Sequence, residues 1–367
     1  LYTLLIMFPV VASAQINTDR VMAIGRNALY FEDYVLSIQY FNQVINAKPY
    51  LSDPYFYRGL AKINLDDFQG AESDCSEAIE RNPFVVSAYQ VRGLARIQQN
   101  NFAGAIEDYT KALEFDPENI GVWHNMALCR IRQEDYKGAK NDLDKLIAIS
   151  PRYTKAYLMR GEVDLKQKDT LAAEKDFGKA IEIDRYDADT WASRAILRLQ
   201  QQRYKDAEAD FDHAIRLSTR NSGVYINRAL ARFHQNNLRG AMSDYDIALD
   251  IDPNNFIGHY NRGLLRAQVG DDNRAIQDFN FVIEMEPDNM MAIFNRGLLL
   301  DQTGDYKGAI KDYSTVINEY PNFLLGYQYR AQARRKIGDV KGADADEFKV
   351  LKAQLDKQNG VDPNKQT

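Results

Sequence analysis

Apolar side chains recur along the chain at three- and four-residue spacing within short segments, which is the pattern of amphipathic α-helices. Two such segments are joined by a short polar turn, for example Gly304-Asp305 or Gly338-Asp339, and a proline commonly follows the second segment. Because proline cannot continue a helix, it separates each helical pair from the next. The pattern predicts an all-α chain of helix pairs without β-sheet.

The breaks between the pairs keep a period of 34 residues. They fall at Pro49, Pro83, Pro117, Pro151, Pro253, Pro287 and Pro321, with Arg185 and Thr219 at the two intervening breaks. This frame predicts ten repeats: 18–51, 52–85, 86–119, 120–153, 154–187, 188–221, 222–255, 256–289, 290–323 and 324–357. Positions are numbered 1 to 34 within each repeat.

Two kinds of column stand out in this frame. Positions 8 and 20 hold small residues, and positions 4 and 24 are often aromatic. Glycine inside a helix costs about 1 kcal/mol relative to alanine, so its recurrence at position 8 indicates a place where a side chain would clash. We expect the small residues to let the two helices of a repeat cross closely, and the aromatic rings to fill the wider gaps between repeats.

The period and these columns together resemble the tetratricopeptide repeat (TPR) family, whose repeat is a helix-turn-helix of 34 residues. The resemblance extends over residues 18–357. It implies a right-handed superhelical solenoid of antiparallel helix pairs. It also implies a non-catalytic scaffold that binds a protein or peptide on its concave face.

One pair of columns departs from the family. Position 7, usually apolar there, is Arg in eight of the ten repeats, and position 23 is Asp in nine. Because Arg prefers a bidentate carboxylate when partly buried, we predict a structural ladder of Arg228 with Asp244, Arg262 with Asp278 and Arg296 with Asp312. The Asp of the preceding repeat is an alternative partner, and an anion site is the alternative role for the arginines.

The resemblance places the first helix of each repeat on the concave face, so polar residues at positions 6 and 13 are candidates for peptide binding. They are Asn125, Asn227, Asn261, Asn295, Gln200, His234, Gln268 and Gln302. An Asn amide both donates and accepts, so a row of them can hold a peptide backbone without reading its side chains. A solvated helix surface is the alternative. Apolar residues at positions 9 and 12 form either a partner groove or a buried stripe.

Composition narrows the partners and the chemistry. The formal net charge is −6, and there is no basic run of the kind that nucleic acid or an anionic membrane requires. No metal-ligand spacing, phosphate-binding loop or nucleophile elbow occurs, so we expect no metal, no cofactor and no catalysis. Cys75 and Cys129 are separated by a whole repeat, too far for a disulfide, and are expected to be buried thiols.

The first residues have the pattern of a signal peptide. Leu1 to Val11 is uncharged and mostly apolar, and Ala12-Ser13-Ala14 provides small residues for cleavage near Ala14-Gln15. Residues 1–14 are therefore predicted to be a signal peptide truncated at its start, and the protein to be periplasmic or in the cell envelope. A buried N-terminal segment is the alternative. The apolar stretch is too short to span a membrane.

The other end is expected to close the array. Glu347, at position 24 of the last repeat, is a charged residue of the kind that a capping repeat exposes, and residues 358–367 form a polar tail or linker. Two functions compete with the peptide scaffold. One is a structural assembly subunit that packs through its convex side or ends, and the other is an accessory region of a larger secretion factor or enzyme.

Overall fold

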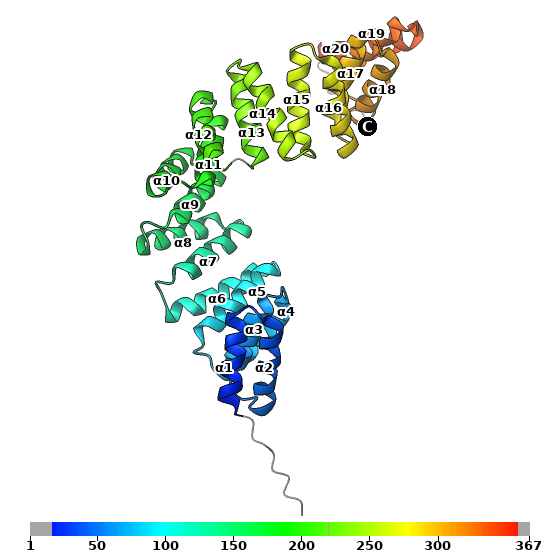
Figure 1. The fold of residues 1–367 in the computed structure, drawn as a ribbon. Coiled ribbons are helices and arrows are strands. Elements are labelled where there is room, and N and C mark those ends of the chain that lie inside the picture. Colours follow the sequence, from blue (N-terminus) through cyan, green and yellow to red (C-terminus); the bar gives the residue numbers. More distant parts are fainter. Residues whose placement is uncertain (1–16, 219, 359–367) are drawn as a thin grey trace, which may run out of the picture. The chain divides into compact units, whose positions relative to one another are not determined.

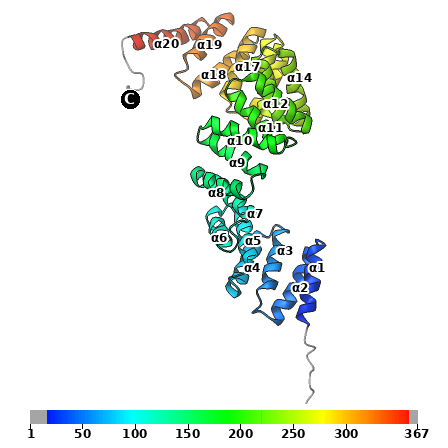
Figure 2. The same cartoon turned by 90° about the vertical axis from the view of Figure 1, so that its left-hand side faces the viewer.

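The computed structural model of the chain describes residues 17–218 and 220–358. The predicted signal peptide and residues 359–367 of the predicted tail lie outside the described residues. The described part consists of α-helices joined by short turns and contains no β-strand (Figures 1 and 2). The prediction of an all-α chain of helix pairs is confirmed.

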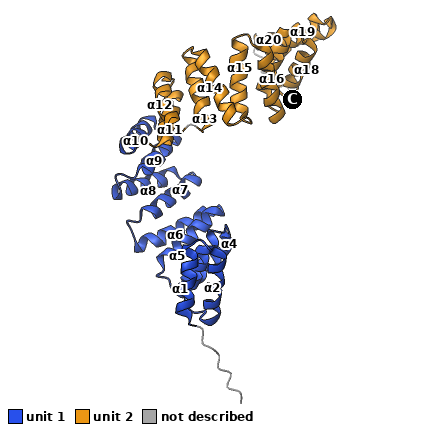
Figure 3. Cartoon of the chain, viewed as in Figure 1, with its two compact units in different colours: residues 1–184 blue, residues 185–367 orange. Residues whose placement is uncertain are grey.

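The chain divides into two compact units, residues 1–184 and 185–367 (Figure 3). The first contains α1 (Thr18–Tyr30), α2 (Tyr34–Ala47), α3 (Asp53–Ile63), α4 (Phe68–Arg81), α5 (Val86–Gln98), α6 (Phe102–Phe115), α7 (Ile120–Arg132), α8 (Tyr136–Ile149), α9 (Thr154–Lys166) and α10 (Thr170–Ile183). The second contains α11 (Ala188–Gln200), α12 (Tyr204–Leu217), α13 (Ser222–His234), α14 (Leu238–Ile251), α15 (Phe256–Gln268), α16 (Asp272–Met285), α17 (Met290–Thr303), α18 (Tyr306–Glu319), α19 (Leu324–Lys336) and α20 (Val340–Gln358). Odd-numbered helices are called first helices and even-numbered helices second helices.

Within each unit the helices pack in chain order. A first helix lies against the second helix of its own pair, and that second helix lies against the first helix of the following pair. Consecutive first helices also touch, as α3 does with α5 and α11 with α13, whereas consecutive second helices in the described residues show no contact of similar extent. The first helices therefore line the more tightly spaced side of each stack.

The turn inside each pair has a common design. Position 15 has a positive φ in every repeat, and glycine occupies it only in the last three, as Gly270, Gly304 and Gly338. Position 16 is Asp or Asn in nine repeats, and its side chain commonly accepts the N–H three residues later, as Asp135 does from Gly138 at 2.9 Å. The left-handed residue reverses the chain and the capped residue starts the second helix.

The helix crossing within a repeat depends on positions 8 and 24. A Cβ added to Gly161 would lie 2.5 Å from the ring of Phe177, and one added to Gly93 would lie 2.8 Å from the ring of Tyr109. The small residues do mark close helix crossings. The expected place of the position 24 rings was incomplete, however: they fill space inside their own repeat and also contact the next repeat, as Phe41 does by stacking on Tyr57 and Tyr313 on Tyr329.

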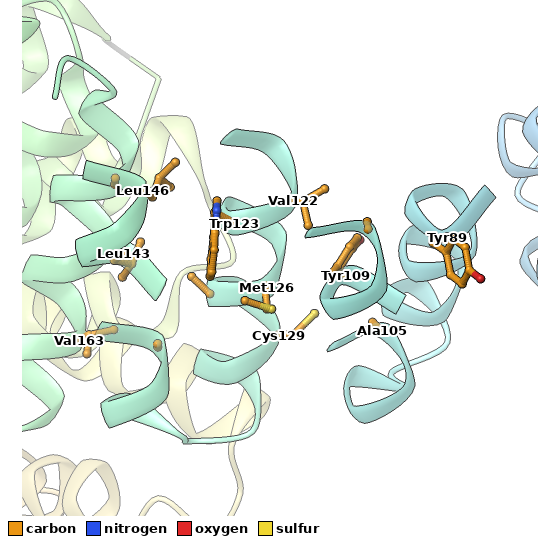
Figure 4. Packing of buried hydrophobic residues seen from close by; sticks show 14 residues of the cluster. Tyr89, Ala105, Tyr109, Val122, Trp123, Met126, Cys129, Leu143, Leu146 and Val163 are labelled. Atoms are coloured by element: carbon orange, nitrogen blue, oxygen red, sulfur yellow. The ribbon is translucent and has the colours of Figure 1, made fainter. Parts of the chain in front are cut away.

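The space between repeats is filled by other side chains. An aliphatic residue at position 28 packs with the ring at position 4 of the next repeat, as Ile317 does with Tyr327. In the first unit a continuous buried cluster extends from Tyr89 on α5 through Trp123 on α7 to Val163 on α9 (Figure 4). The core is therefore a line of shared interfaces and has no single centre.

Both cysteines lie in this kind of core. Cys129 belongs to the cluster of Figure 4 and Cys75 to a neighbouring cluster in the same unit; both are fully buried and unpaired. Burial raises the pKa of Cys75 to about 12 and that of Cys129 to about 11. At neutral pH both are uncharged thiols that pack as small apolar groups.

Candidate functional site

The arginines of position 7 face the aspartates of position 23 in the same repeat. Each guanidinium donates to both carboxylate oxygens, and the Nη2–Oδ1 bonds are Arg228–Asp244 at 2.6 Å, Arg262–Asp278 at 2.8 Å and Arg296–Asp312 at 2.7 Å. The three carboxylates are buried and the guanidinium groups are partly buried. This is the bidentate, partly buried arrangement for which Arg is suited.

The same arginines also join neighbouring repeats. The remaining Nη1 atom donates to position 25 of the preceding repeat, from Arg228 to Asp212 at 2.6 Å, from Arg262 to Asp246 at 2.8 Å and from Arg296 to Asn280 at 2.8 Å. Each arginine thus ties its own second helix to that of the repeat before. The sequence left open that each arginine pairs with the position 23 Asp of the preceding repeat. In that repeat the arginine contacts the residue at position 25 instead.

Sequence reasoning missed a second basic column. Position 11 is Lys or Arg in seven repeats, and each of these side chains pairs with the buried Asp at position 23 of its own repeat. The seven basic residues are Lys62, Arg96, Arg130, Arg198, Arg232, Arg266 and Arg334. In the fourth repeat, where position 7 is Met126, Arg130 alone reaches Asp142, at 2.7 Å. Burial raises the pKa of Asp142, and Arg130 only partly offsets that effect.

These contacts leave the arginines little capacity for an external anion. Burial by itself would lower the pKa of Arg228, but the hydrogen bonds that Arg228 donates to Asp244, together with the charge of that carboxylate, outweigh it and the pKa is raised. The same holds for Arg262 with Asp278. The geometry supports a structural role for the ladder.

The four candidate Asn residues at position 6 all lie half-buried on first helices. Asn295 Nδ2 donates to the Tyr260 hydroxyl at 3.1 Å, and Asn125 lies beside the buried hydroxyl of Tyr109. The side-chain amides of Asn227 and Asn261 make no hydrogen bond to any described residue. These two amides, one repeat apart on α13 and α15, are free to bind a ligand.

The candidates at position 13 lie at the ends of first helices and are exposed. They are Gln200, His234, Gln268 and Gln302. The His234 ring stacks on Tyr204 with the ring centroids 4.6 Å apart. The apolar residues of position 9 range from half-buried to exposed, and those of position 12 are half-buried, so part of this stripe remains open to a partner.

A hollow of about 250 Å³ lies between α15 and α17 in the second unit. Its lining is Phe256, Ile257, Tyr260, Asn289 and Met291, and Met291 is 67% exposed. Sequence reasoning missed this site because it did not follow position 2, which is polar or Gly in the first seven repeats and becomes Ile257, Met291 and Leu325 in the last three. Since Tyr260 accepts from Asn295, the hollow borders the Asn column.

A larger hollow, of about 430 Å³, lies between α7 and α9 in the first unit. Its lining mixes apolar and charged groups, among them Met159, Arg132, Glu162 and Lys166. His124 also lines this hollow. Burial lowers the pKa of its imidazole, and the positive charge of Lys155 lowers it further. His124 is therefore uncharged at neutral pH, and it faces the Tyr153 hydroxyl at 3.3 Å.

Over residues 17–218 and 220–358, no group of three or more His, Cys, Asp or Glu side chains could hold a metal ion. In the same part of the chain, no helix is both long enough and apolar enough to cross a bilayer.

Stacked helix pairs with one recurring turn and one recurring interface define a helical-repeat protein. Models described as TPR repeat or tetratricopeptide repeat match residues 93–129, 120–153, 154–187, 193–256 and 260–322. Together these matches span more than half of the chain. The chain belongs to the tetratricopeptide repeat family.

Solved structures show the same fold. The chain is similar to a tetratricopeptide repeat protein from Parabacteroides merdae, with 21% identity and a TM-score of 0.53 over 68% of this chain and 98% of that one. It is also similar to the C-terminal part of a TPR repeat-containing protein from Cytophaga hutchinsonii, with 17% identity and a TM-score of 0.53 over 65% and 97% of the two chains. A search of curated proteins gave no match.

Proposed function

We propose that this protein is a non-catalytic scaffold that holds an extended peptide or protein segment on its first-helix face. The observation that carries the proposal is the pair Asn227 and Asn261. These residues stand at the same position of successive repeats, half-buried and with amides that bond to no described residue. A half-buried amide without an internal partner is suited to bind a peptide backbone, because it can both donate and accept.

The apolar hollow beside this column supplies an anchor. Ile257 and Met291 are both more than half exposed, and they meet Phe256 and Tyr260 around the hollow. Binding sites for peptides combine backbone hydrogen bonds with pockets for particular side chains. We therefore propose a ligand in extended conformation that carries a large aliphatic or aromatic side chain, with its backbone across α13 and α15 and that side chain between α15 and α17.

The test selects peptides from a displayed random library on the full chain and measures their affinity by fluorescence polarisation. Each neutral hydrogen bond contributes about 0.5–1.5 kcal/mol, so the Asn227→Ala, Asn261→Ala double variant should bind about tenfold to a hundredfold more weakly. Selected peptides should share a large apolar residue, and Met291→Asp should abolish the preference for it. Asn295→Ala should weaken peptide binding less than the changes at Asn227 and Asn261, because the Asn295 amide already donates to Tyr260.

Asn318→Ala is the matched control, since Asn318 is an exposed Asn within a second helix, α18. It should leave affinity unchanged. Melting temperatures should not fall in the Asn double variant or in the control, because Ala is a better helix former than Asn. Unchanged affinity in the double variant would reject the Asn pair as the binding element.

We also propose that the scaffold works in the cell envelope. The support is the sequence pattern of residues 1–14, an apolar stretch followed by Ala12-Ser13-Ala14. Expression of the natural gene from its own start codon in a bacterial host, followed by mass spectrometry of the periplasmic fraction, tests it. A mature N-terminus at Gln15 is expected, and an uncleaved cytoplasmic product would contradict the proposal.

A further inference from the structure

The last helix, α20, carries an apolar stripe that no described helix covers. Phe348, Leu351 and Leu355 are spaced three and four residues apart, so they share one face of the helix. They are 67%, 52% and 47% exposed. Single exposed apolar side chains are ordinary, but several on one helix face mark an interaction surface.

The place of this stripe in the repeat shows what kind of surface it is. Leu351 stands at position 28, which is Ile or Leu in every repeat. At other joints that side chain is covered by the next repeat, as Ile317 is by Tyr327. The α20 stripe is therefore a stacking face of the type that normally receives the first helix of another repeat.

Phe348 changes the chemistry of this face. At seven internal joints a polar residue at position 25 accepts a hydrogen bond from the position 7 arginine of the next repeat: Asn42, Ser76, Asp144, Asp212, Asp246, Asn280 and Ser314. Phe348 stands at this position in the last repeat and has no such acceptor. A helix that covers α20 in the internal register should therefore carry an apolar residue, and not Arg, at position 7.

Among the helices that the structure describes, one is exposed and has that property. In α1, position 7 is Ile24, which is 37% exposed, and the flanking Val21 is half-exposed. The only other repeat without Arg there has Met126, which is buried inside the first unit. The two ends are complementary: Ile24 stands where internal repeats have the position 7 Arg, and Phe348 stands where they have the polar acceptor of position 25.

We propose that the chain self-associates head to tail, with α1 of one copy covering α20 of the next and Ile24 packing against Phe348. This surface is separate from the first-helix face proposed to bind peptide. A heterologous contact of this kind leaves one α1 face and one α20 face unpaired at the ends of each assembly, so further copies can add. It builds short linear chains whose length rises with concentration. Arg20 replaces the small residue of position 3, so the joint should be weaker than an internal one.

The test measures average mass by sedimentation velocity over a wide range of concentrations of the full chain. Wild type should show mass that rises with concentration. Phe348→Asp or Ile24→Arg alone places a charge against an apolar surface and should weaken association by about tenfold or more. The double variant Ile24→Arg, Phe348→Asp should associate again, because it recreates the contact that Arg228 makes with Asp212 at 2.6 Å.

Leu171→Asp is the matched control: Leu171 is 81% exposed near the start of α10, which belongs to neither the first nor the last repeat, and its replacement should not alter association. Circular dichroism should show all variants equally helical, since the changed residues are exposed. A wild type that stays monomeric would overturn the proposal. A double variant that stays dissociated would also overturn it. Association that is lost with Phe348→Asp but unaffected by Ile24→Arg would overturn it as well, because it would indicate a symmetric α20–α20 contact.

Discussion

Each buried aspartate of position 23 needs a cation, because a carboxylate left without a partner in the interior costs several kcal/mol. The repeats meet this need to different degrees. Asp244 receives Arg228 and also Arg232, whereas Asp312 receives Arg296 and has Leu300 at position 11 of its repeat. The Arg–Asp pairs of positions 7 and 23 therefore differ in how many cations contact the buried carboxylate.

Two matched substitutions test this difference. Arg296→Met removes the cation that contacts Asp312 and should lower the free energy of unfolding by about 2–4 kcal/mol. Arg228→Met leaves Arg232 on Asp244 at 2.8 Å and should cost about 1 kcal/mol, as the natural Met126 beside Arg130 suggests. Urea unfolding and hydrogen exchange over the affected helix pair measure both. Equal losses in the two variants would show that position 11 does not share the carboxylate.

The buried thiols make a prediction about pH. Burial raises the pKa of Cys75 from its ordinary value of 9.0 to about 12, so the folded state holds this proton more tightly than the unfolded state. The resulting stability is present below about pH 9 and is lost as pH rises towards 12. Cys75→Ala should therefore flatten the decline of stability over this range relative to wild type. Native protein at pH 8 should react with a thiol reagent only through local opening, and rapid reaction of both thiols would contradict their burial.

At the scale of the helix pair, the crossing is set by what stands at positions 8 and 24. Gly161 faces Phe177, whereas the fourth repeat combines Ala127 with Leu143. A larger residue on one helix is thus matched by a smaller one on the other. Ala195, in a repeat that has Phe211, shows that a ring and an alanine can also be accommodated together.

Gly161→Ala should lower the free energy of unfolding by about 1–3 kcal/mol, because its Cβ would meet the Phe177 ring at 2.5 Å. Adding Phe177→Leu recreates the Ala127–Leu143 combination and should restore part of the loss. A double-mutant cycle by thermal unfolding measures the coupling. Additive effects of the two substitutions would show that the ring and the glycine do not limit each other.

For the whole molecule, regular spacing was enough to predict the helix pairs, since proline, small residues and apolar positions all recur at one period. The partners of Arg228, Arg262 and Arg296 also followed from residue type. The place of the position 24 rings was predicted only in part, because sequence spacing does not show which side of a second helix faces its own first helix. For the same reason, Glu347 did not show that α20 has an apolar outer face: Glu347 pairs with Arg335 in its own repeat.

The site was predictable only in part. A column of Asn residues can be seen in the sequence, but the bond from Asn295 to Tyr260 joins two repeats and depends on how they stack. The hollow between α15 and α17 likewise needs residues from both helices in place. Periodic positions could be assigned to a helix, whereas contacts between repeats required the structure.

Because each repeat contacts its neighbours, a core defect should stay local. Ala241 is fully buried on α14, and Ala241→Leu should overpack its helix crossing at a cost of about 1–3 kcal/mol. Gly263→Leu should act similarly one repeat further on, since even a Cβ there lies 3.2 Å from Phe279. Hydrogen exchange should quicken over α13–α16 and remain as in wild type over α1–α6. Equal loosening at both ends would mean that the chain unfolds as one cooperative body, which its line of neighbour interfaces does not predict.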